Sequence, residues 1–466
     1  MNGYYKHQRG QALLAMLAFI IVLAIAMVYL FNTSQLLSER AQAKVLADHA
    51  AYNTAVKQAQ LLNANAYMNK AKIANQLAVA QSVSVASWAK HFEPVPQNSQ
   101  ILNGIPYFGS YIYQGIATTS TMIQPLAEMQ SLYVSANALA TRYISTQQSA
   151  LNRTALIDVK QSPELVVKNS SIGKNFIATP LLSSQTTSSI NPLSQDFLKR
   201  YEGNSSDPYA GRMRMKNILL KAKDAFTNER RSNSDKRIDI PWLLFPIRNA
   251  RIERRGGAEI SQDLNQWKGV DTMSFHYERL RCRGLSCRWR RYEQPIGYGS
   301  ALARRDSSDG DHGNRESYDN VNINKTASGR SRQYIPRWDS RSSYNGLNSQ
   351  GEYGVPEYWD LSKDFLNQDK PALEIAVKIS KSSNQLNTTN GISNFKAGDT
   401  IDIKSKNGLS AISTAQVYFE RPLQDSQGNN TYLNSGKQEK ASLFNPYWNV
   451  KLTDNSTKSI VEANVR

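Results

Sequence analysis

The chain has 466 residues, with 56 Lys and Arg against 38 Asp and Glu, and its formal net charge is +18. That length allows two or three domains and excludes a single small module. Two Cys and five His exclude a disulfide-dense scaffold and a multi-cysteine zinc array, because a closed zinc site needs about four ligands. The positive charge indicates that any charged partner is acidic.

The first predicted element is a transmembrane helix at Ala12–Phe31, after a cytoplasmic tail at residues 1–11. The helix sequence holds no charge, Pro or Gly, and at about 1.5 Å per residue it matches the roughly 30 Å of hydrocarbon in a bilayer. Lys6, His7 and Arg9 precede it, which places the N-terminus in the cytoplasm. A cleaved signal has a shorter apolar core of about 7–15 residues, so we expect a retained anchor in the lipid bilayer.

The anchor is expected to continue outward as one long helix over residues 32–93. No Gly or Pro lies between Gly10 and Pro94, and the composition favours helix. Apolar residues recur mostly three or four apart, which predicts a stripe that packs within the chain or against a neighbouring protein. That stripe is Leu37, Ala41, Val45, Tyr52, Ala55, Ala59, Leu62, Ala66, Ile73, Leu77 and Ala80.

Residues 94–237 read as a mostly helical stalk region. An amphipathic segment predicts a helix over Pro125–Gln148, with Pro125 in its first turn. The Ser-, Thr- and Asn-rich stretch Asn169–Ser194 is typical of a linker, and Arg212–Thr227 can form a further helix.

Residues 238–466 are predicted to form a strand-rich outer domain, so the fold class is α+β. A polar insertion at about 306–350 holds few aliphatic residues. β-branched and aromatic runs bounded by Gly, Pro and Asn indicate the strands. These are Trp242–Arg251, Thr272–Cys282, Cys287–Tyr292, Leu373–Ile379, Thr400–Lys404, Ala415–Glu420 and Trp448–Leu452.

Cys282 and Cys287 flank a short polar turn between two strand-like runs. This spacing predicts a β-hairpin whose register a disulfide would fix, if the chain faces an oxidising compartment. A redox pair more often has two intervening residues, and a metal site would need two further ligands.

The same hairpin is rich in arginine and carries Tyr277, Trp289 and Tyr292. Strand alternation would place every second arginine on one side, as a solvated face or a contact for an acidic ligand. The candidate contacts are Arg279, Arg281, Arg288, Arg290 and Arg291, next to Arg283. A solvated face or an acidic protein partner is preferred. No nucleic acid is expected, because a membrane-tethered outer domain rarely meets it except during DNA uptake.

Nothing in the sequence indicates an enzyme or a cofactor. A phosphate-binding loop ending in Lys-Ser or Lys-Thr, an H-E-x-x-H pair and a G-x-S-x-G elbow are all missing. The acidic run of Asp306, Asp309, Asp311 and Glu316 lacks the spacing of an EF-hand. It reads as a solvated turn, and an anchored envelope enzyme with this run as its metal site is the weaker alternative.

The opening Arg9-Gly10-Gln11-Ala12-Leu13, the apolar span and Ser34–Tyr52 resemble TadE/TadG-like Flp (tight adherence) pilus-assembly proteins. Ala411–Pro422 and Ser442–Leu452 are similar to the end of the longer, TadG-like proteobacterial members. The resemblance implies a pilin-like helix, a bacterial inner-membrane anchor and a periplasmic domain.

The resemblance also implies a non-enzymatic part in building a type IV class pilus, as an assembly component or a minor pilin-like subunit. Other pilus-assembly membrane proteins or pilins would be the partners. Ala15 stands where the major pilin signal usually has Glu, so the uncleaved form is preferred. The alternative is a surface adhesin or DNA-uptake receptor that binds an acidic ligand through the Arg-rich hairpin.

Overall fold

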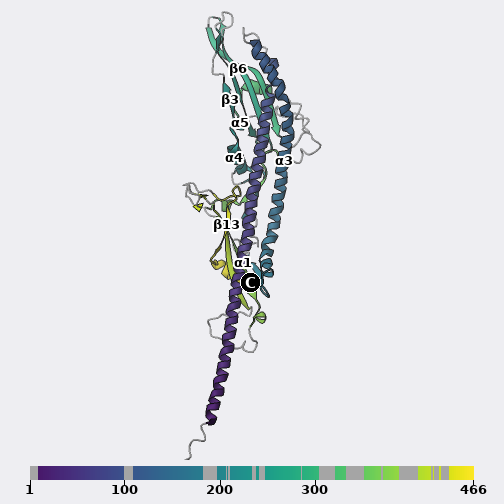
Figure 1. The fold of residues 1–466 in the computed structure, drawn as a ribbon. Helices are drawn as coiled ribbons and strands as arrows, with labels where there is room; N and C mark the ends of the chain where they lie inside the picture. The colour runs from purple at the N-terminus through teal and green to yellow at the C-terminus, as the bar shows by residue number, and fades with distance from the viewer. Residues whose placement is uncertain are drawn as a thin grey trace, which may run out of the picture. The chain divides into compact units, whose positions relative to one another are not determined.

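The sequence forms two long helices and several antiparallel strands in the computed structural model of the chain (Figure 1). Two units form, and each is built from several stretches of the chain. The first unit comprises residues 1–64, 151–199 and 361–466, and the second comprises 65–150 and 200–360. The structure describes residues 9–98, 109–181, 197–205, 207, 210–233, 238–240, 247–284, 286–303, 321–331, 351–368, 371–387, 408–420, 423–424, 430–431 and 440–465.

Helix α1 runs from Arg9 to Lys90, which is 82 residues without a break. Among the described residues it is the one helix long and apolar enough to cross a membrane. Its apolar N-terminal stretch is exposed all round, with Leu13 70% and Phe19 67% accessible. Figure 1 shows no other element beside this purple part of the helix. Apolar side chains on every face suit a lipid environment rather than water.

The first unit packs α1 on a four-stranded antiparallel sheet of order β1-β9-β10-β13. The strands are β1 Ile177–Leu181, β9 Ala372–Lys381, β10 Leu409–Phe419 and β13 Trp448–Thr453. The side-chain amide of Asn63 on α1 both donates to Trp448 O and accepts from Trp448 N, each at 3.0 Å. This pair satisfies the free backbone edge of β13 and fixes the helix to it.

Alanines and hydrogen-bonded polar residues form the face of α1 that is buried in the first unit. The predicted stripe is divided here: Ala55, Ala59 and Leu62 are buried within the chain. Leu37, Val45 and Tyr52 are exposed at 59%, 44% and 42% and do not pack within it. Small alanine side chains let the helix approach the sheet closely. Glu39 accepts from Lys381 Nζ on β9, whereas Thr54 Oγ1 donates to the Ala50 carbonyl on α1 itself. The buried set is Glu39, Ala43, Leu46, Ala47, Ala50, Ala51, Thr54, Ala55, Gln58, Ala59, Leu61 and Leu62.

The second unit contains the remainder of α1, helix α2 (Val95–Asn98), and a sheet of order β3-β5-β6-β7 with β4 beside β5. Its strands are β3 Arg230–Asn233, β4 Ile238–Ile240, β5 Ile247–Ile260, β6 Trp267–Arg283 and β7 Ser286–Ala303. The last turns of α1 lie directly on this sheet. A Cβ at Gly299 would stand 2.4 Å from the backbone N of His91, so only glycine allows that approach.

A buried charged cluster holds α1 to the sheet of the second unit. Asp271 on β6 accepts two hydrogen bonds from Arg230, at 2.8 and 2.7 Å, and a third from Ser87 Oγ at 2.7 Å. Trp267 is fully buried and donates from Nε1 to Gln76 Oε1 at 3.2 Å. Asp271, Ser87 and Trp267 therefore have hydrogen-bond partners in the interior, which offset the cost of their desolvation.

Several predicted boundaries in residues 94–237 are corrected. Helix α3 runs from Gly109 to Lys168, so Pro125 lies inside it and not in its first turn. A proline removes one backbone hydrogen bond, and a helix of 60 residues keeps the others. Strand β1 lies in the predicted linker, because its residues pair with Ala376–Ser380 of β9.

The predicted helix Arg212–Thr227 is two helices, α4 (Met213–Ala222) and α5 (Ala225–Asn228). Asp224 interrupts it, because its side chain accepts from Thr227 N as an N-cap. The predicted strand Thr400–Lys404 lies outside the described residues, as do residues 1–8 and 241–246.

Short elements complete the chain. They are β2 (Leu198–Tyr201) paired with β8 (Tyr358–Leu361), β11 (Leu423–Gln424) paired with β12 (Asn430–Thr431), α6 (Lys325–Ser331), α7 (Lys363–Leu366), η3 (Ser383–Gln385) and α8 (Thr457–Val465). Helix α6 lies within the predicted polar insertion, where Asn324 and Ala327 are buried.

Candidate functional site

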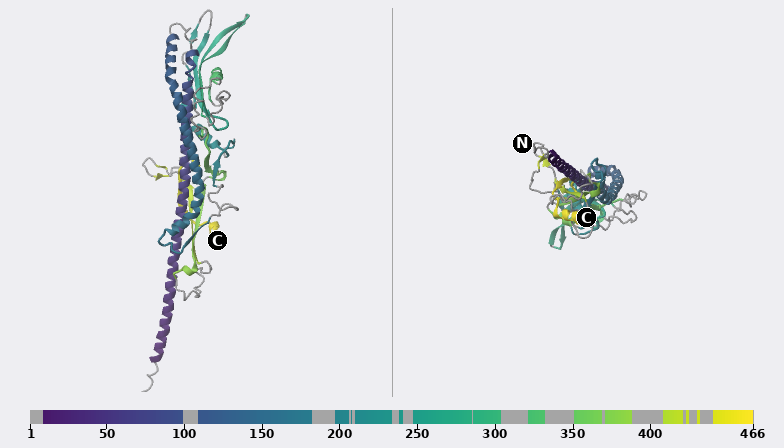
Figure 2. Two further views of the ribbon diagram at one scale, coloured as in Figure 1. Left: turned by 90° about the vertical axis from the view of Figure 1, so that its right-hand side faces the viewer. Right: turned by 90° about the horizontal axis from the view of Figure 1, so that it is seen from below.

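The Arg-rich segment forms the distal part of the hairpin between β6 and β7, which Figure 2 shows in teal as a projecting two-stranded ribbon. Residues Arg279 to Arg283 and Ser286 to Arg291 are exposed, apart from the half-buried Leu280, with residue 285 not described. Directly paired residues share a face of the ribbon. The pairs Arg279↔Arg290 and Arg281↔Arg288 therefore lie on one side, and Glu278↔Arg291 and Leu280↔Trp289 lie on the other.

One side, which we call the arginine face, carries Arg279, Arg281, Arg283, Arg288 and Arg290. No Asp or Glu of β6 or β7 lies on this side of the hairpin end. Like charges that face each other across two strands repel. The arrangement thus concentrates positive charge at a cost to hairpin stability.

The aromatic residues continue the arginine face toward the base of the hairpin. The rings of Tyr277 and Tyr292 stack with their centroids 5.5 Å apart, and Phe275 lies 5.4 Å from Tyr277. Both tyrosines are half-buried. Their ring faces contact each other, so they add packing energy to the hairpin and present little flat surface to a ligand.

The opposite side, the tryptophan face, has its charges paired. Glu278 accepts from Arg248 Nε at 2.8 Å and from Arg291 Nε at 3.2 Å. Hydrogen bonds from Arg248, Asn249 and Arg291 lower the pKa of the Glu278 carboxyl below its usual value. The guanidinium of Arg248 also lies 4.2 Å from the ring centre of Trp289, which is 37% exposed.

A disulfide joins Cys282 to Cys287 on the tryptophan face of the hairpin. Gly284 begins the turn with a φ of 63°, a left-handed conformation that glycine adopts without strain. The bond closes the loop next to the two facing arginine pairs, so it opposes the fraying that their repulsion favours.

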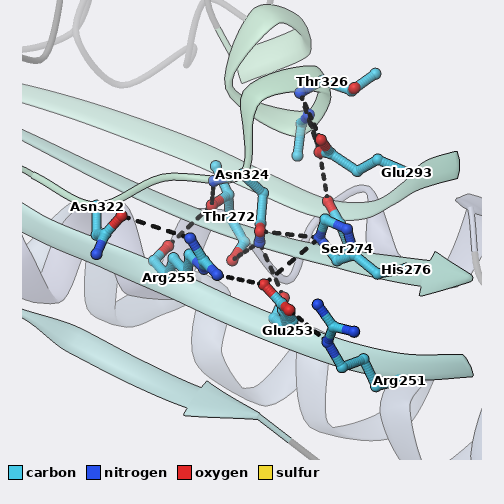
Figure 3. A network of polar contacts seen from close by, with 11 residues as sticks. Arg251, Glu253, Arg255, Thr272, Ser274, His276, Glu293, Asn322, Asn324 and Thr326 are labelled. Carbon is cyan, nitrogen blue, oxygen red and sulfur yellow. Dashed lines mark hydrogen bonds and ion pairs between the residues drawn. The ribbon is translucent and has the colours of Figure 1, made fainter. Parts of the chain in front are cut away.

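Figure 3 shows a polar network at the base of the hairpin, on the same side of the sheet as the tryptophan face. Glu253 is buried and accepts from Arg251 Nε at 2.5 Å and from Arg255 Nη2 at 2.6 Å, while His276 Nε2 lies 3.8 Å away. Burial alone would raise the pKa of Glu253, but the hydrogen bond from Arg251 and the charges of His276 and Arg255 lower it.

The network also docks residues 321–331 on the sheet. Asn324 donates from Nδ2 to Glu253 O at 2.9 Å, and its backbone N donates to Thr272 Oγ1 at 3.0 Å. Glu293 accepts from the backbone N of Thr326 and of Ala327, both at 3.0 Å (Figure 3). The hydrogen bonds of these groups hold residues 321–331 on the sheet, so we assign the network a structural role.

The charged residues that α1 buries in the second unit were not among the predicted site residues. Lys72 is 1% exposed and donates to Gln148 Oε1 on α3 and to Glu357 O, each at 2.7 Å. Burial lowers the pKa of Lys72 to about 8. A lysine within an Ala- and Gln-rich helix is the one sequence signal for this site. Its partners lie far away in sequence, so its burial could not be predicted from neighbouring residues.

The acidic run Asp306, Asp309, Asp311 and Glu316 lies outside the described residues. Within the described part of the chain, no group of three or more His, Cys, Asp or Glu side chains is placed to hold a metal ion.

Comparison with known proteins gave no match to a family model, to a curated protein or to a solved structure.

Proposed function

We propose that this chain is a single-pass protein of the bacterial inner membrane that takes part, without catalysis, in assembly of a Flp/Tad-type pilus. Its C-terminal region would lie in the periplasm, and it would act as an assembly component or as a minor pilin-like subunit. The observation that carries the proposal is the surface of α1: the apolar stretch Ala12–Phe31 is exposed, and an exposed apolar stripe follows it.

That stripe consists of Leu37, Ala41, Val45 and Tyr52, which lie within about a quarter of the helix circumference at 3.6 residues per turn. The first unit uses a different face of α1 for its own core, where Ala43, Leu46 and Ala47 are buried. One face of this membrane-proximal helix therefore packs against its own domain, and a second, apolar face is exposed. Such a helix is suited to lateral packing against another membrane helix.

The test deletes the gene, expresses the wild type or a variant in the deletion strain, and quantifies the pili sheared from the cells. The wild-type gene should restore pili, and the double variant Leu37→Glu/Val45→Glu should not, because two charges on the stripe oppose helix packing. The matched control is Lys57→Glu/Gln60→Glu, whose exposed positions lie on other faces of α1. All variants must reach the membrane at equal levels.

Normal piliation in the deletion strain would contradict the proposal. The competing function is a surface adhesin or DNA-uptake receptor that uses the arginine face. It predicts that Arg281→Gln/Arg288→Gln/Arg290→Gln abolishes attachment or DNA uptake while pili remain normal and the stripe variant behaves as wild type.

A further inference from the structure

The end of the β6–β7 hairpin is amphipathic in both charge and polarity. Its arginine face carries five guanidinium groups, and the tryptophan face carries Trp289, Leu280 and the Cys282–Cys287 disulfide. Glu278 neutralises one of the two arginines beside it, so the tryptophan face has a local charge of about +1. We propose that this hairpin end binds a lipid surface rich in anionic phosphate headgroups.

Protection of the sheet edge alone does not explain the arginine face. Charged residues on an exposed edge strand prevent association with other strands, and alternating acidic and basic residues would serve that purpose. Here Arg279 faces Arg290 and Arg281 faces Arg288, where opposite charges would instead have stabilised the hairpin. The same sign at every charged position of this face indicates an anionic ligand.

The geometry favours an extended surface of charges. Every second residue of a strand is about 6.8 Å apart, so the arginines form a flat array on a ribbon held closed by the disulfide. Guanidinium groups keep their charge at any physiological pH and bind phosphate oxygens in a bidentate manner. The stacked Tyr277 and Tyr292 rings do not present faces on which bases could stack, which disfavours single-stranded nucleic acid.

The tryptophan face selects a membrane over a soluble polyanion. Elements that lie in the interface of a bilayer combine Arg or Lys on one face with Trp, Phe or Leu on the other. Trp289 is 37% exposed although Leu280 and Arg248 pack beside it. Tryptophan prefers the headgroup region, where its ring is partly buried and its N–H stays hydrated. A soluble polyanion would make no use of this face.

The experiment uses the full chain, with its anchor held in nanodiscs of phosphatidylcholine, in a flotation assay with added vesicles. Phosphatidylcholine vesicles containing phosphatidylglycerol should carry the protein upward at low salt, and pure phosphatidylcholine vesicles should not. The triple variant Arg281→Gln/Arg288→Gln/Arg290→Gln should bind roughly 100-fold less, at about fivefold for each arginine near the surface.

The matched control removes three exposed positive charges elsewhere, in Lys57→Gln/Lys70→Gln/Arg153→Gln, and should bind like the wild type. Trp289→Ser should weaken vesicle binding about tenfold and leave binding of soluble polyphosphate unchanged. Three results would overturn the proposal: equal binding of both triple variants, equal binding to both kinds of vesicle, or binding of polyphosphate without binding of anionic vesicles.

Discussion

Glu39 and Lys381 lie 342 positions apart in the sequence, and their side chains form a buried ion pair with Oε1 2.9 Å from Nζ. Glu39 is on α1, and Lys381 is the last residue of β9. Glu39 also accepts from the backbone N of Asn387 at 2.9 Å. This pair attaches the membrane-proximal part of α1 to the strands of the first unit.

We predict that replacing one partner of this ion pair destabilises the first unit more than replacing both partners with apolar residues. Glu39→Leu or Lys381→Met alone should cost about 3–5 kcal/mol, because each leaves a buried charge without its partner. The double variant Glu39→Leu/Lys381→Met should cost less than the sum of the two. Denaturant unfolding in detergent measures these values.

The exposed pair Lys44–Asp48 is the control for that series. Its side chains are 53% and 30% accessible, and Lys44→Gln should change stability by less than about 1 kcal/mol. Strict additivity of the Glu39 and Lys381 single variants would contradict the coupling.

The contact between α1 and the second sheet predicts a steric effect at Gly299. Gly299→Ala places a Cβ 2.4 Å from His91 N and 2.7 Å from the carbonyl carbon of Lys90, so the helix backbone must move. We expect a loss of about 1–3 kcal/mol or more in thermal unfolding.

Gly329→Ala is the matched control, because nothing lies within 4 Å of a Cβ there. Gly329 is in α6, where alanine is the better helix former, so this change should be neutral or slightly stabilising. Equal behaviour of the two alanine variants would show that α1 does not approach the sheet at Gly299.

The sequence alone allows prediction of the elements whose signals are local. The absence of Gly and Pro between Gly10 and Pro94 predicted the long helix, which ends at Lys90. Alternating β-branched and aromatic residues located the cores of β6, β7 and β9, although the strands extend further. Pairing with neighbours lengthened these strands, and that information is not local.

The polar core of α1 could not be predicted, because a charged residue is read as exposed until its partner is known. Glu39 and Lys72 are buried by partners hundreds of positions away. At the hairpin, strand alternation predicted the shared face of Arg279, Arg281 and Arg283. The pairing of that face with Arg288 and Arg290 depends on a register that the sequence leaves open.

Lys72 predicts an unusual rise of stability at alkaline pH. Burial lowers the pKa of Lys72 from 10.5 to about 8 in the folded chain. Between these two values the unfolded chain holds the proton and the folded chain has lost it, so stability rises with pH. Below about pH 8 both states are protonated, and the full cost of the buried charge is present.

The free energies of unfolding of the wild type and of Lys72→Met, measured at several pH values from 8 to 10.5, test this pH dependence. The stability difference should move in favour of the wild type by on the order of 3 kcal/mol up to pH 10.5. Lys70→Met, at an exposed position on the same helix, should show no such change. A pH-independent difference for Lys72→Met would mean that Lys72 titrates normally.

The disulfide is predicted to stabilise the end of the β6–β7 hairpin and not the middle of the sheet. Cys282→Ser/Cys287→Ser removes a closure over a sequence separation of 5 residues, worth about 2 kcal/mol in chain entropy. Amide hydrogen exchange at Arg281 and Arg288 should accelerate on the order of 30-fold. Exchange at the paired Thr272 and Tyr298 in the middle of the sheet should stay unchanged, and acceleration there as well would contradict a local role.

The central claim is that Ala12–Phe31 remains as an anchor and that the chain acts in pilus assembly from the periplasmic side. The most direct measurement shears pili from intact cells and blots the sheared and membrane fractions for a tag placed after Arg466. We predict a species of the full 52.2 kDa in the inner membrane, whose tag is digested only after the periplasm is opened. A soluble, shortened species, or a tag digested only after the cytoplasm is opened, would contradict the account.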